Sequence, residues 1–341
     1  MRVGFWRAGR ALALLALGVA APSLAGAALR SAEQWLGEMQ IAVRTQSYSG
    51  QVVQQRGSQR RVSRIVQRVD GETIVQRVQM LDGAPIEFIR RRAPGVDEVR
   101  CYRLDQRRIV LERRVLETRF PTIFGLPPVD IVRNYALKLG PLEPVAAHRT
   151  QVIELQPRDG LRHAYRVWAE QTTGLPLRLQ ILDGSKMVEQ IGFVDIDLVH
   201  KPTAAQVAPA WPTQGWSTET PAFESVEAAA HGWSVRPPTG FILRSSVLRR
   251  SSAPDRAAPT LQLFFSDGLA HVSVFVEDPA IGPEAPDRAL ERGVLSFMTR
   301  RVGAARVTAL GEVTAAGAHA AAQSVQWQAR PAAAFQGGSN P

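Results

Sequence analysis

The sequence predicts an α+β protein of two domains in which antiparallel sheets carry most of the structure. Asp-Gly and similar turn signals recur about every ten residues between short strand-like runs, which is typical of an antiparallel meander. Only a few stretches show the 3.6-residue apolar spacing of helices. The chain has 341 residues, which is longer than one domain of about 150 residues needs.

The first 27 residues have the features of a secretory signal peptide. A basic start precedes the apolar run 11–21, and Ala25 and Ala27 occupy the positions of an A-x-A cleavage site. The run is too short to span a bilayer, for which a helix needs about 20 residues. We therefore expect residues 1–27 to be removed and the mature chain to be exported to the periplasm. The alternative is a buried first helix.

The charge balance limits the class of partner. The chain has 41 basic and 31 acidic residues, a formal net charge of +10, and only Lys138, Lys186 and Lys201 are lysines. An exported protein rarely meets nucleic acid, so we expect no nucleic-acid partner. The anions that remain are phosphorylated lipid head groups or an acidic protein segment, which guanidinium groups bind well. A solvated arginine-rich surface without a partner is the open alternative.

The first predicted domain, residues 28–200, combines one long meander with two helices. A helix is predicted at 32–43 and another at 130–139, with Gly140 ending the second. The only cysteine, Cys101, is expected to be buried in a strand, and a reactive or intermolecularly paired thiol is the alternative. A sheet of about ten strands curls or closes. The predicted strands are 48–55, 61–69, 73–81, 86–91, 99–104, 109–115, 151–156, 162–169, 177–182 and 186–198.

An apolar, proline-rich segment interrupts this meander at 120–129. Proline cannot donate to a sheet ladder, so the segment is predicted as a loop whose apolar side chains need cover. A curled sheet with such a loop and a helix against it favours a cavity for an acyl chain, and burial of each CH₂ gains about 0.8 kcal/mol. A filled core fits the same alternation. The candidate lipid-binding residues are Phe120, Ile123, Phe124 and Leu126.

A Pro-, Ala- and Thr-rich linker at 201–220 leads to a smaller domain, residues 221–330. Its clearest feature is a hairpin of strands 261–266 and 269–277 around Asp267-Gly268, with one face lined by alternate apolar residues. We predict a strand at 240–248, a helix from Asp287 to Arg301, and strands at 306–313 and 323–329. Residues 331–341 are predicted to be a disordered tail.

Motifs for catalysis and metal binding are missing from the sequence. It contains no G-x-S-x-G, H-E-x-x-H, C-x-x-C, Walker or G-x-G-x-x-G pattern, and no two histidines have the local spacing of zinc ligands. Asp195 and Asp197 share one strand face, which we interpret as solvated surface. We therefore expect no enzyme activity, catalytic residue, metal or cofactor. An exported hydrolase with dispersed catalytic residues is an alternative.

An ordered series of short segments across both predicted domains resembles the periplasmic MucB/RseB regulators of the envelope-stress sigma factor. Residues 120–128 match that family more loosely than the rest of the chain. The matching segments are Tyr48-Ser49-Gly50, Val69-Asp70-Gly71-Glu72, Leu81-Asp82-Gly83, Cys101-Tyr102, Pro157-Arg158-Asp159-Gly160, Gly174-Leu175-Pro176-Leu177, Leu182-Asp183-Gly184, Ser266-Asp267-Gly268-Leu269-Ala270, Val272-Ser273-Val274-Phe275 and Gly311-Glu312-Val313.

The resemblance implies a lipoprotein-carrier-like antiparallel half-barrel with helices, followed by a smaller α+β domain. It also implies binding to the periplasmic domain of a membrane-bound anti-sigma factor, which would shield that factor from site-1 proteolysis. Lipopolysaccharide or the acyl chains of lipoproteins would release the regulator from the anti-sigma factor. The runner-up is a periplasmic lipid or lipoprotein carrier without a regulatory role, and a homo-oligomer is left open. The expected partner-binding residues are Asp267, Leu269, His271, Ser273 and Phe275.

Overall fold

The computed structural model describes residues 30–113, 120–125, 128–221, 223–249, 259–277 and 287–328. Contacts group the chain from Ser31 onward into one compact unit. The predicted signal peptide, the predicted tail 331–341 and Leu126 lie outside the described residues. Among the residues that the structure describes, no helix is both long and apolar enough to cross a membrane.

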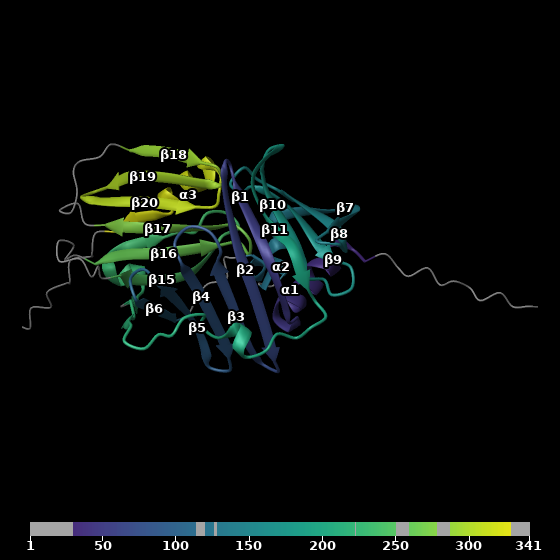
Figure 1. Ribbon diagram of the computed structural model, residues 1–341. Helices are drawn as coiled ribbons and strands as arrows, with labels where there is room; N and C mark the ends of the chain where they lie inside the picture. Colours follow the sequence, from purple (N-terminus) through teal and green to yellow (C-terminus); the bar gives the residue numbers. More distant parts are fainter. Residues whose placement is uncertain are drawn as a thin grey trace, which may run out of the picture. The chain divides into compact units, whose positions relative to one another are not determined.

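A twelve-stranded sheet contains every strand of residues 48–219 (Figure 1). Its order is β12-β6-β5-β4-β3-β2-β1-β11-β10-β9-β8-β7, antiparallel except for the parallel β12–β6 pair, and it ends at two separate edges as an open half-barrel. The strands are β1 (Tyr48–Arg56), β2 (Gln59–Asp70), β3 (Thr73–Met80), β4 (Ile86–Ala93), β5 (Val96–Arg103), β6 (Arg108–Arg113), β7 (Tyr135–Val145), β8 (His148–Pro157), β9 (Ala164–Glu170), β10 (Pro176–Asp183), β11 (Lys186–Asp197) and β12 (Ser217–Glu219).

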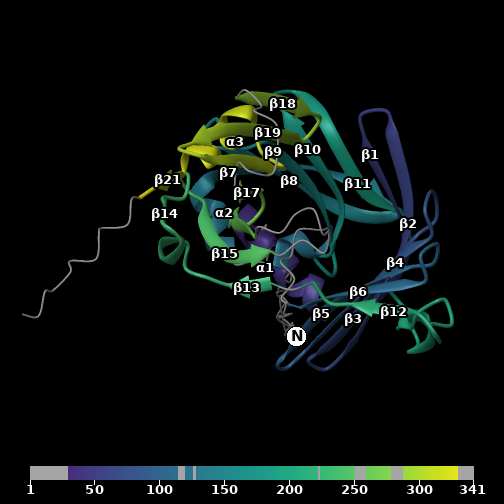
Figure 2. The same cartoon turned by 90° about the vertical axis from the view of Figure 1, so that its left-hand side faces the viewer.

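The sheet curves around three short helical segments: α1 (Ala32–Thr45), the 3₁₀ turn η1 (Thr122–Gly125) and α2 (Pro128–Asn134) (Figure 2). Helix α1 begins at Ser31, whose hydroxyl accepts a hydrogen bond from the backbone of Gln34, and the Gln34 side chain completes a capping box. Its stripe of Trp35, Leu36, Met39 and Val43 is buried, as the spacing predicts. The concave face of the sheet is therefore filled by helices along much of its length.

The predicted second helix, 130–139, is wrong over its second half. Helix α2 ends at Asn134, and Tyr135 begins β7, which pairs with β8. The apolar spacing that predicts a helix here is also compatible with a strand, since Leu137 and Leu139 alternate with exposed or polar neighbours. Pairing with the neighbouring strand decides between the two, and local spacing does not contain that information.

The segment predicted as a linker lies largely along the first sheet. It contains the 3₁₀ turn η2 (Ala205–Val207) and β12, which pairs with β6. Arginine side chains of the sheet hold its backbone, with Arg68 Nη1 donating to Pro202 O at 2.6 Å and Arg77 Nη1 to Gln206 O at 3.2 Å. The backbone polar groups of this loop are thus partly satisfied by the sheet.

A seven-stranded antiparallel sheet holds most of the later strands, in the order β13-β15-β16-β17-β20-β19-β18. Helix α3 packs on one face of it, against β17, β19 and β20. The elements are β13 (Phe223–Ser225), η3 (Ala228–His231), β14 (Trp233–Val235), β15 (Ile242–Arg249), β16 (Thr260–Ser266), β17 (His271–Glu277), β18 (Arg288–Arg292), β19 (Leu295–Val302), β20 (Ala305–Gly311), α3 (Ala315–Gln323) and β21 (Val325–Trp327), with β14 and β21 forming a separate pair.

The predicted helix 287–301 is wrong, because this segment is the β18–β19 hairpin. Gly293 adopts a left-handed φ of +63° at its turn, a conformation that glycine permits. Helix α3 was missed, although its alanine-rich sequence favours a helix. Thr314 caps it by accepting a hydrogen bond from Gly317 N. The prediction of a strand at 323–329 holds only for β21.

The face of the β16–β17 hairpin predicted as apolar is buried against α3, since Val272, Val274 and Val276 lie in the second hydrophobic core. The expectation that Cys101 is buried needs correction, because this residue of β5 is only half-buried. It lies opposite Phe88 on the concave side of the first sheet.

Candidate functional site

The turn of the β16–β17 hairpin is buried against the first sheet's helices and strands. Leu269 belongs to the core that α1 and the twelve-stranded sheet share. Gly268 has a φ of +108°, and a Cβ there would lie 3.2 Å from Ile131 Cγ1 of α2. The carboxylate of Asp267 accepts hydrogen bonds from Tyr135 Oη at 3.1 Å, Leu269 N at 2.9 Å, Ala270 N at 2.8 Å and Arg162 Nε.

Arg162 is the second half of this buried junction, and its side chain is 0% exposed. Its guanidinium bonds to both Asp267 and Asp159, donates from Nη2 to Thr239 O at 2.8 Å, and stacks 4.4 Å from the centre of the Phe241 ring. The two carboxylates raise the pKa of Arg162 although burial lowers it. The buried guanidinium of Arg162 is therefore paired with two carboxylates, a backbone carbonyl and an aromatic ring. A buried ion is stable only when such partners replace the lost water.

Helix α2 makes further polar contacts with the later part of the chain. Asp130 pairs with Arg244 of β15 at 2.9 Å, and Asn134 Nδ2 donates to Gly240 O at 3.1 Å. Since α2 follows η1 after two residues, one short segment adjoins both the first sheet's concave face and the second sheet's hairpin. We refer to the contacts of Asp267, Arg162 and α2 as the hairpin junction.

The five residues expected to bind a partner separate into two groups. Asp267 and Leu269 are buried in the hairpin junction. His271, Ser273 and Phe275 are half-buried on the face of β17 opposite α3. Phe264 stacks on His271 with ring centres 5.7 Å apart, and Leu310 of β20, which is 41% exposed, lies opposite Ser273. We call His271, Ser273, Phe275 and Leu310 the outer face of the second sheet.

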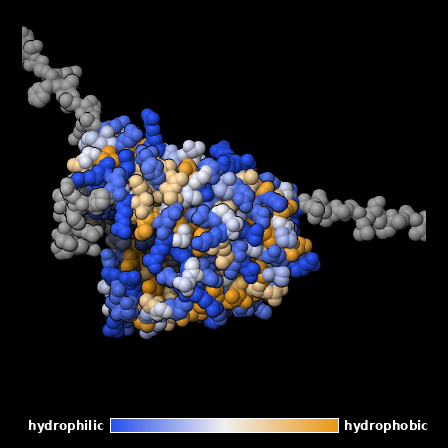
Figure 3. Space-filling model, turned by 90° about the horizontal axis from the view of Figure 1, so that it is seen from above, coloured by the Kyte–Doolittle hydropathy of each residue, from blue (hydrophilic) through white to orange (hydrophobic). Residues whose placement is uncertain are grey.

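Large hydrophobic side chains elsewhere on the surface are scattered. Leu290 of β18 and Trp327 of β21 are more than half exposed. On the face seen in Figure 3, hydrophobic residues are interspersed with hydrophilic ones. Single exposed apolar residues of this kind are normal for a folded protein.

The described residues of the predicted lipid-binding segment are core residues. Phe120, Ile123 and Phe124 are 8%, 4% and 2% exposed and belong to the first core. Phe120 packs against the ring of Phe193 at 5.8 Å, and η1 contacts α1. These side chains therefore cover part of the concave face themselves, and their part in ligand binding stays a prediction.

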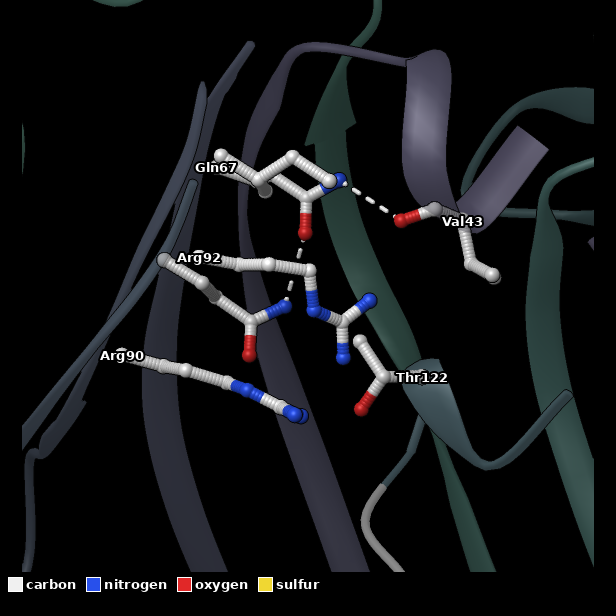
Figure 4. A pocket seen from close by; sticks show the side chains of 7 residues that line it. Val43, Gln67, Arg90, Arg92 and Thr122 are labelled. Atoms are coloured by element: carbon white, nitrogen blue, oxygen red, sulfur yellow. Dashed lines mark hydrogen bonds between the residues drawn. The ribbon is translucent and has the colours of Figure 1, made fainter. Parts of the chain in front are cut away.

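A small pocket opens beside this segment, between α1, η1 and strands β2–β4 (Figure 4). Figure 4 shows Arg90 and Arg92 extending from β4 toward η1, where Thr122 lies. Because they are two residues apart on one strand, both point to the concave face, and Arg91 points to the opposite one. The residues that line the pocket are Val43, Gln67, Ile74, Gln76, Arg90, Arg92 and Thr122.

Two glutamines form the polar floor of this pocket. Gln67 is 0% exposed and donates from Nε2 to Val43 O at 3.0 Å and Gln46 O at 2.9 Å, at the end of α1. Gln76 donates to Gln67 Oε1 at 3.0 Å and to Tyr48 Oη at 3.2 Å. Buried polar groups are stable when they are bonded in this way, so the floor is rigid and its bonds are used within the protein.

The two arginines that line the pocket pair with an aspartate. Arg90 forms a two-pronged ion pair with Asp97, at 2.9 and 2.8 Å, and the same carboxylate lies 3.7 Å from Arg92 Nε. Burial lowers the pKa of Arg92, as do the charges of Arg90 and of Arg44 at the end of α1, against the opposing effect of Asp97. The guanidinium groups of Arg90 and Arg92 thus both lie beside one carboxylate.

The arginine run 90–92 is visible in the sequence, but nothing in the sequence places Gln67 and Gln76 beside it. They meet Arg90 through cross-strand register, with Gln67 opposite Gln76 and Gln76 opposite Arg90. Within the described ranges, no group of three or more His, Cys, Asp or Glu side chains is arranged to hold a metal ion. Asp195 is exposed, and Asp197 binds the backbone of the turn after β11.

Comparison with known proteins identifies the chain's relatives. The models of the MucB/RseB N-terminal domain and of the MucB/RseB C-terminal domain match residues 31–211 and 227–326. The sigma factor AlgU regulatory protein MucB of Pseudomonas aeruginosa is 28% identical over 312 residues, covering 89% of this chain and 92% of its own length.

Two solved structures of that kind are similar over most of the chain. The Pseudomonas aeruginosa MucA/MucB complex matches with a TM-score of 0.69 and 24% identity, covering 87% of this chain and 99% of the solved one. MucB in complex with MucA(peri) matches with a TM-score of 0.67 and 25% identity, covering 88% and 100%. With both family domains present in order, the chain belongs to the MucB/RseB family.

Proposed function

We propose that this protein is a periplasmic, non-enzymatic regulator that binds the periplasmic domain of a membrane-bound anti-sigma factor. Binding shields that factor from site-1 proteolysis. Lipopolysaccharide or lipoprotein acyl chains release the regulator from the anti-sigma factor. The observation that carries the proposal is the similarity over 88% of the chain to a protein solved in complex with MucA(peri). The predicted signal peptide supports the periplasmic location.

The outer face of the second sheet is the surface that we assign to the partner. Helix α3 occupies the other face of this sheet, whereas His271, Ser273 and Phe275 are only half-buried. Aromatic residues such as Phe275 are enriched at the centre of protein interfaces, and charged residues are depleted there. Asp267 and Leu269 instead support this surface from within the hairpin junction.

The lipid-responsive part is assigned to the concave face of the first sheet near η1. Phe120, Ile123 and Phe124 cover a hydrophobic interior that an acyl chain enters only if this segment moves. Helix α2, next along the chain, lies against the second sheet's hairpin at Ile131, and Tyr135, the first residue of β7, donates a hydrogen bond to Asp267 of that hairpin. A displacement there would therefore reach the domain to which we assign the partner.

The test is calorimetric titration of the mature protein with the periplasmic domain of its own anti-sigma factor, without and then with lipopolysaccharide. Tight binding that lipid weakens is the expected result. Tight binding that lipid leaves unchanged would retain the regulator and remove the lipid signal. No binding would overturn the proposal and favour a lipid carrier.

Point substitutions locate the partner surface better than deletion of the second domain, because Leu269 lies in the first core and its removal would disturb that core. Ser273→Arg places a bulky charge at the centre of the outer face and should weaken partner binding at least about tenfold, as loss of a central contact does. Glu72→Arg, on the exposed β2–β3 turn, is the matched control. Equal affinities for both variants would exclude the outer face as the partner surface.

A further inference from the structure

We propose that Arg56 of β1 is a positioning residue for partner binding: it holds Glu312 at the end of β20 and thereby fixes how the second sheet presents its outer face. The proposal rests on the proposed function and deepens it, because it names a residue of the first sheet on which partner affinity depends. Arg56 acts through the orientation of the second sheet and not by touching the partner.

One end of the second sheet is docked on the first domain at two places. The tip of the β16–β17 hairpin lies in the hairpin junction. The tip of the β18–β19 hairpin also reaches the first core, to which Val294 belongs with 0% exposure. Three strand spacings, about 14 Å, separate the two tips in the order β16-β17-β20-β19-β18. One contact leaves a sheet free to rotate about it, whereas a second contact at this distance fixes its orientation.

Arg56 is the centre of the second contact, where the ends of β18–β20 lie beside β1 (Figure 1). Its Nε donates to Glu189 of β11 at 2.6 Å, and its Nη2 donates to Glu312 at 3.2 Å. The Glu189 side chain is only 6% exposed, so it requires the guanidinium as a partner and keeps Arg56 in place. A Cβ on Gly293 would lie 3.6 Å from Arg56 Cγ. The β18–β19 tip therefore packs on the aliphatic stem of the same side chain.

Glu312 connects Arg56 to the outer face through the backbone. Its N–H donates to His271 O at 3.0 Å, and Leu310 lies two residues before it, in β20. His271 and Leu310 both belong to the outer face. A displacement of Glu312 therefore moves two residues of the surface that we assign to the partner.

The two contacts differ in how easily they break. The Arg162–Asp267 pair of the hairpin junction is 0% exposed on both sides, whereas Arg56 and Glu312 are 29% and 21% exposed. An ion pair in contact with water breaks at lower cost than a buried one. The second sheet thus has one permanent contact and one releasable contact, and release of Glu312 by Arg56 lets the sheet turn about the hairpin junction.

The experiment is calorimetric titration of the mature protein with the periplasmic domain of its own anti-sigma factor, repeated for Arg56→Gln, Glu312→Gln and the double variant. We expect each single variant to lose about fivefold in affinity, at the lower end of coupling between sites. The double variant should lose less than about twofold more than Arg56→Gln, because both substitutions break the same contact. Losses that multiply would mean that Arg56 contacts the partner itself and would overturn the positioning role, as would unchanged affinities.

Arg61→Gln is the matched control. Arg61 lies on the neighbouring strand β2, opposite Gln54, and lines the same small pocket as Arg56. Its loss removes the same charge and should change affinity less than about twofold; a loss equal to that of Arg56→Gln would mean an effect of net charge and would overturn the proposal. Arg56→Lys keeps a positive charge between the two carboxylates and should bind at least about twofold more tightly than Arg56→Gln. Equal affinities of these two variants would overturn a contact based on charge. Thermal unfolding of each variant checks that it is folded.

Hydrogen exchange of the mature protein without its partner separates this proposal from the proposed function. In Glu312→Gln, backbone amides of the β18–β19 hairpin should exchange at least about threefold faster than in the unsubstituted protein, while those of the β16–β17 tip stay unchanged. Unchanged exchange in both hairpins would overturn the contact at Arg56. If the β18–β19 hairpin exchanges faster but the unsubstituted protein does not bind the anti-sigma domain, the proposed function fails while Arg56 stands as the residue that orients the second sheet.

Discussion

Arginines occupy two very different environments in this protein. At the hairpin junction, Arg162 is fully buried between Asp267 and Asp159 and also bonds a backbone carbonyl. At the pocket, Arg90 and Arg92 both pair with the carboxylate of Asp97 and remain partly exposed. The first arrangement is closed to water, whereas the second remains in contact with it.

The difference lies in how much water each charged group keeps. Burying an ion is costly unless partners compensate for the lost water, so Arg162 is held by groups from several parts of the chain. Arg90 and Arg92 keep part of their water, so they need less compensation from the protein. Burial, rather than the presence of arginine, distinguishes the two sites, and the following predictions test that distinction.

The largest effect is expected for Asp267→Asn. It leaves Arg162 buried with one carboxylate fewer and should lower the free energy of unfolding by about 3–5 kcal/mol, measured by urea denaturation. Glu277→Gln, which breaks the partly exposed pair with Arg306 in the same sheet, should cost no more than about 1 kcal/mol. Similar costs would show that the hairpin junction is not a stabilising centre.

A smaller loss is expected for Gly268→Ala at the tip of the same hairpin. Its φ of +108° disfavours an L side chain, and the new Cβ would lie 3.2 Å from Ile131, so the expected cost is about 1–3 kcal/mol. Gly71→Ala has a φ of +58° and nothing within 4 Å of its Cβ, and isolates the backbone effect. A cost at Gly268 below that at Gly71 would contradict the close packing of the tip on α2.

At the pocket, Arg92→Gln should leave the free energy of unfolding within about 1 kcal/mol of the original value or raise it. Burial and the neighbouring arginines already lower the pKa of Arg92, so its charge does not favour folding. Arg162→Gln is the opposite case and should be strongly destabilising. A loss above about 2 kcal/mol for Arg92→Gln would remove the contrast between the sites.

The smallest effect concerns Asp197, an exposed residue outside both arginine sites. Hydrogen bonds from the backbone of His200 and Val199 lower its pKa from 3.8 to about 2. Stability from such a group is present above its unfolded pKa and is lost as pH falls from about 4 through 2. Asp197→Asn should flatten this part of an acid-unfolding curve, whereas Asp195→Asn should not. An unchanged curve would contradict the lowered pKa.

The strands were largely predictable because their signals are local. Alternating apolar residues and Asp-Gly turns located β1–β5, β10 and the β16–β17 hairpin, each within a few residues. Segments 130–139 and 287–301 failed for a common reason. Their apolar residues are compatible with both a helical stripe and one face of a strand, and pairing with β8 or β20 selects the strand.

The candidate sites were predictable only in part. The arginine run 90–92 and the Asp267-Gly268 turn are visible in the sequence. The partners of Asp267 lie more than a hundred residues away at Tyr135 and Arg162. The glutamines beneath Arg90 are likewise brought there by strand register. Neither arrangement leaves a local pattern.

The sequence by itself determined the strand-rich composition, the hairpin turns and the family, since turn chemistry, alternation and ordered motifs are properties of neighbouring residues. Only the tertiary structure decided that Asp267 and Leu269 are buried and that Arg90 and Arg92 share one carboxylate. Burial and charge pairing depend on which distant segments meet, because side chains across a sheet or core desolvate and neutralise one another only after the chain has folded.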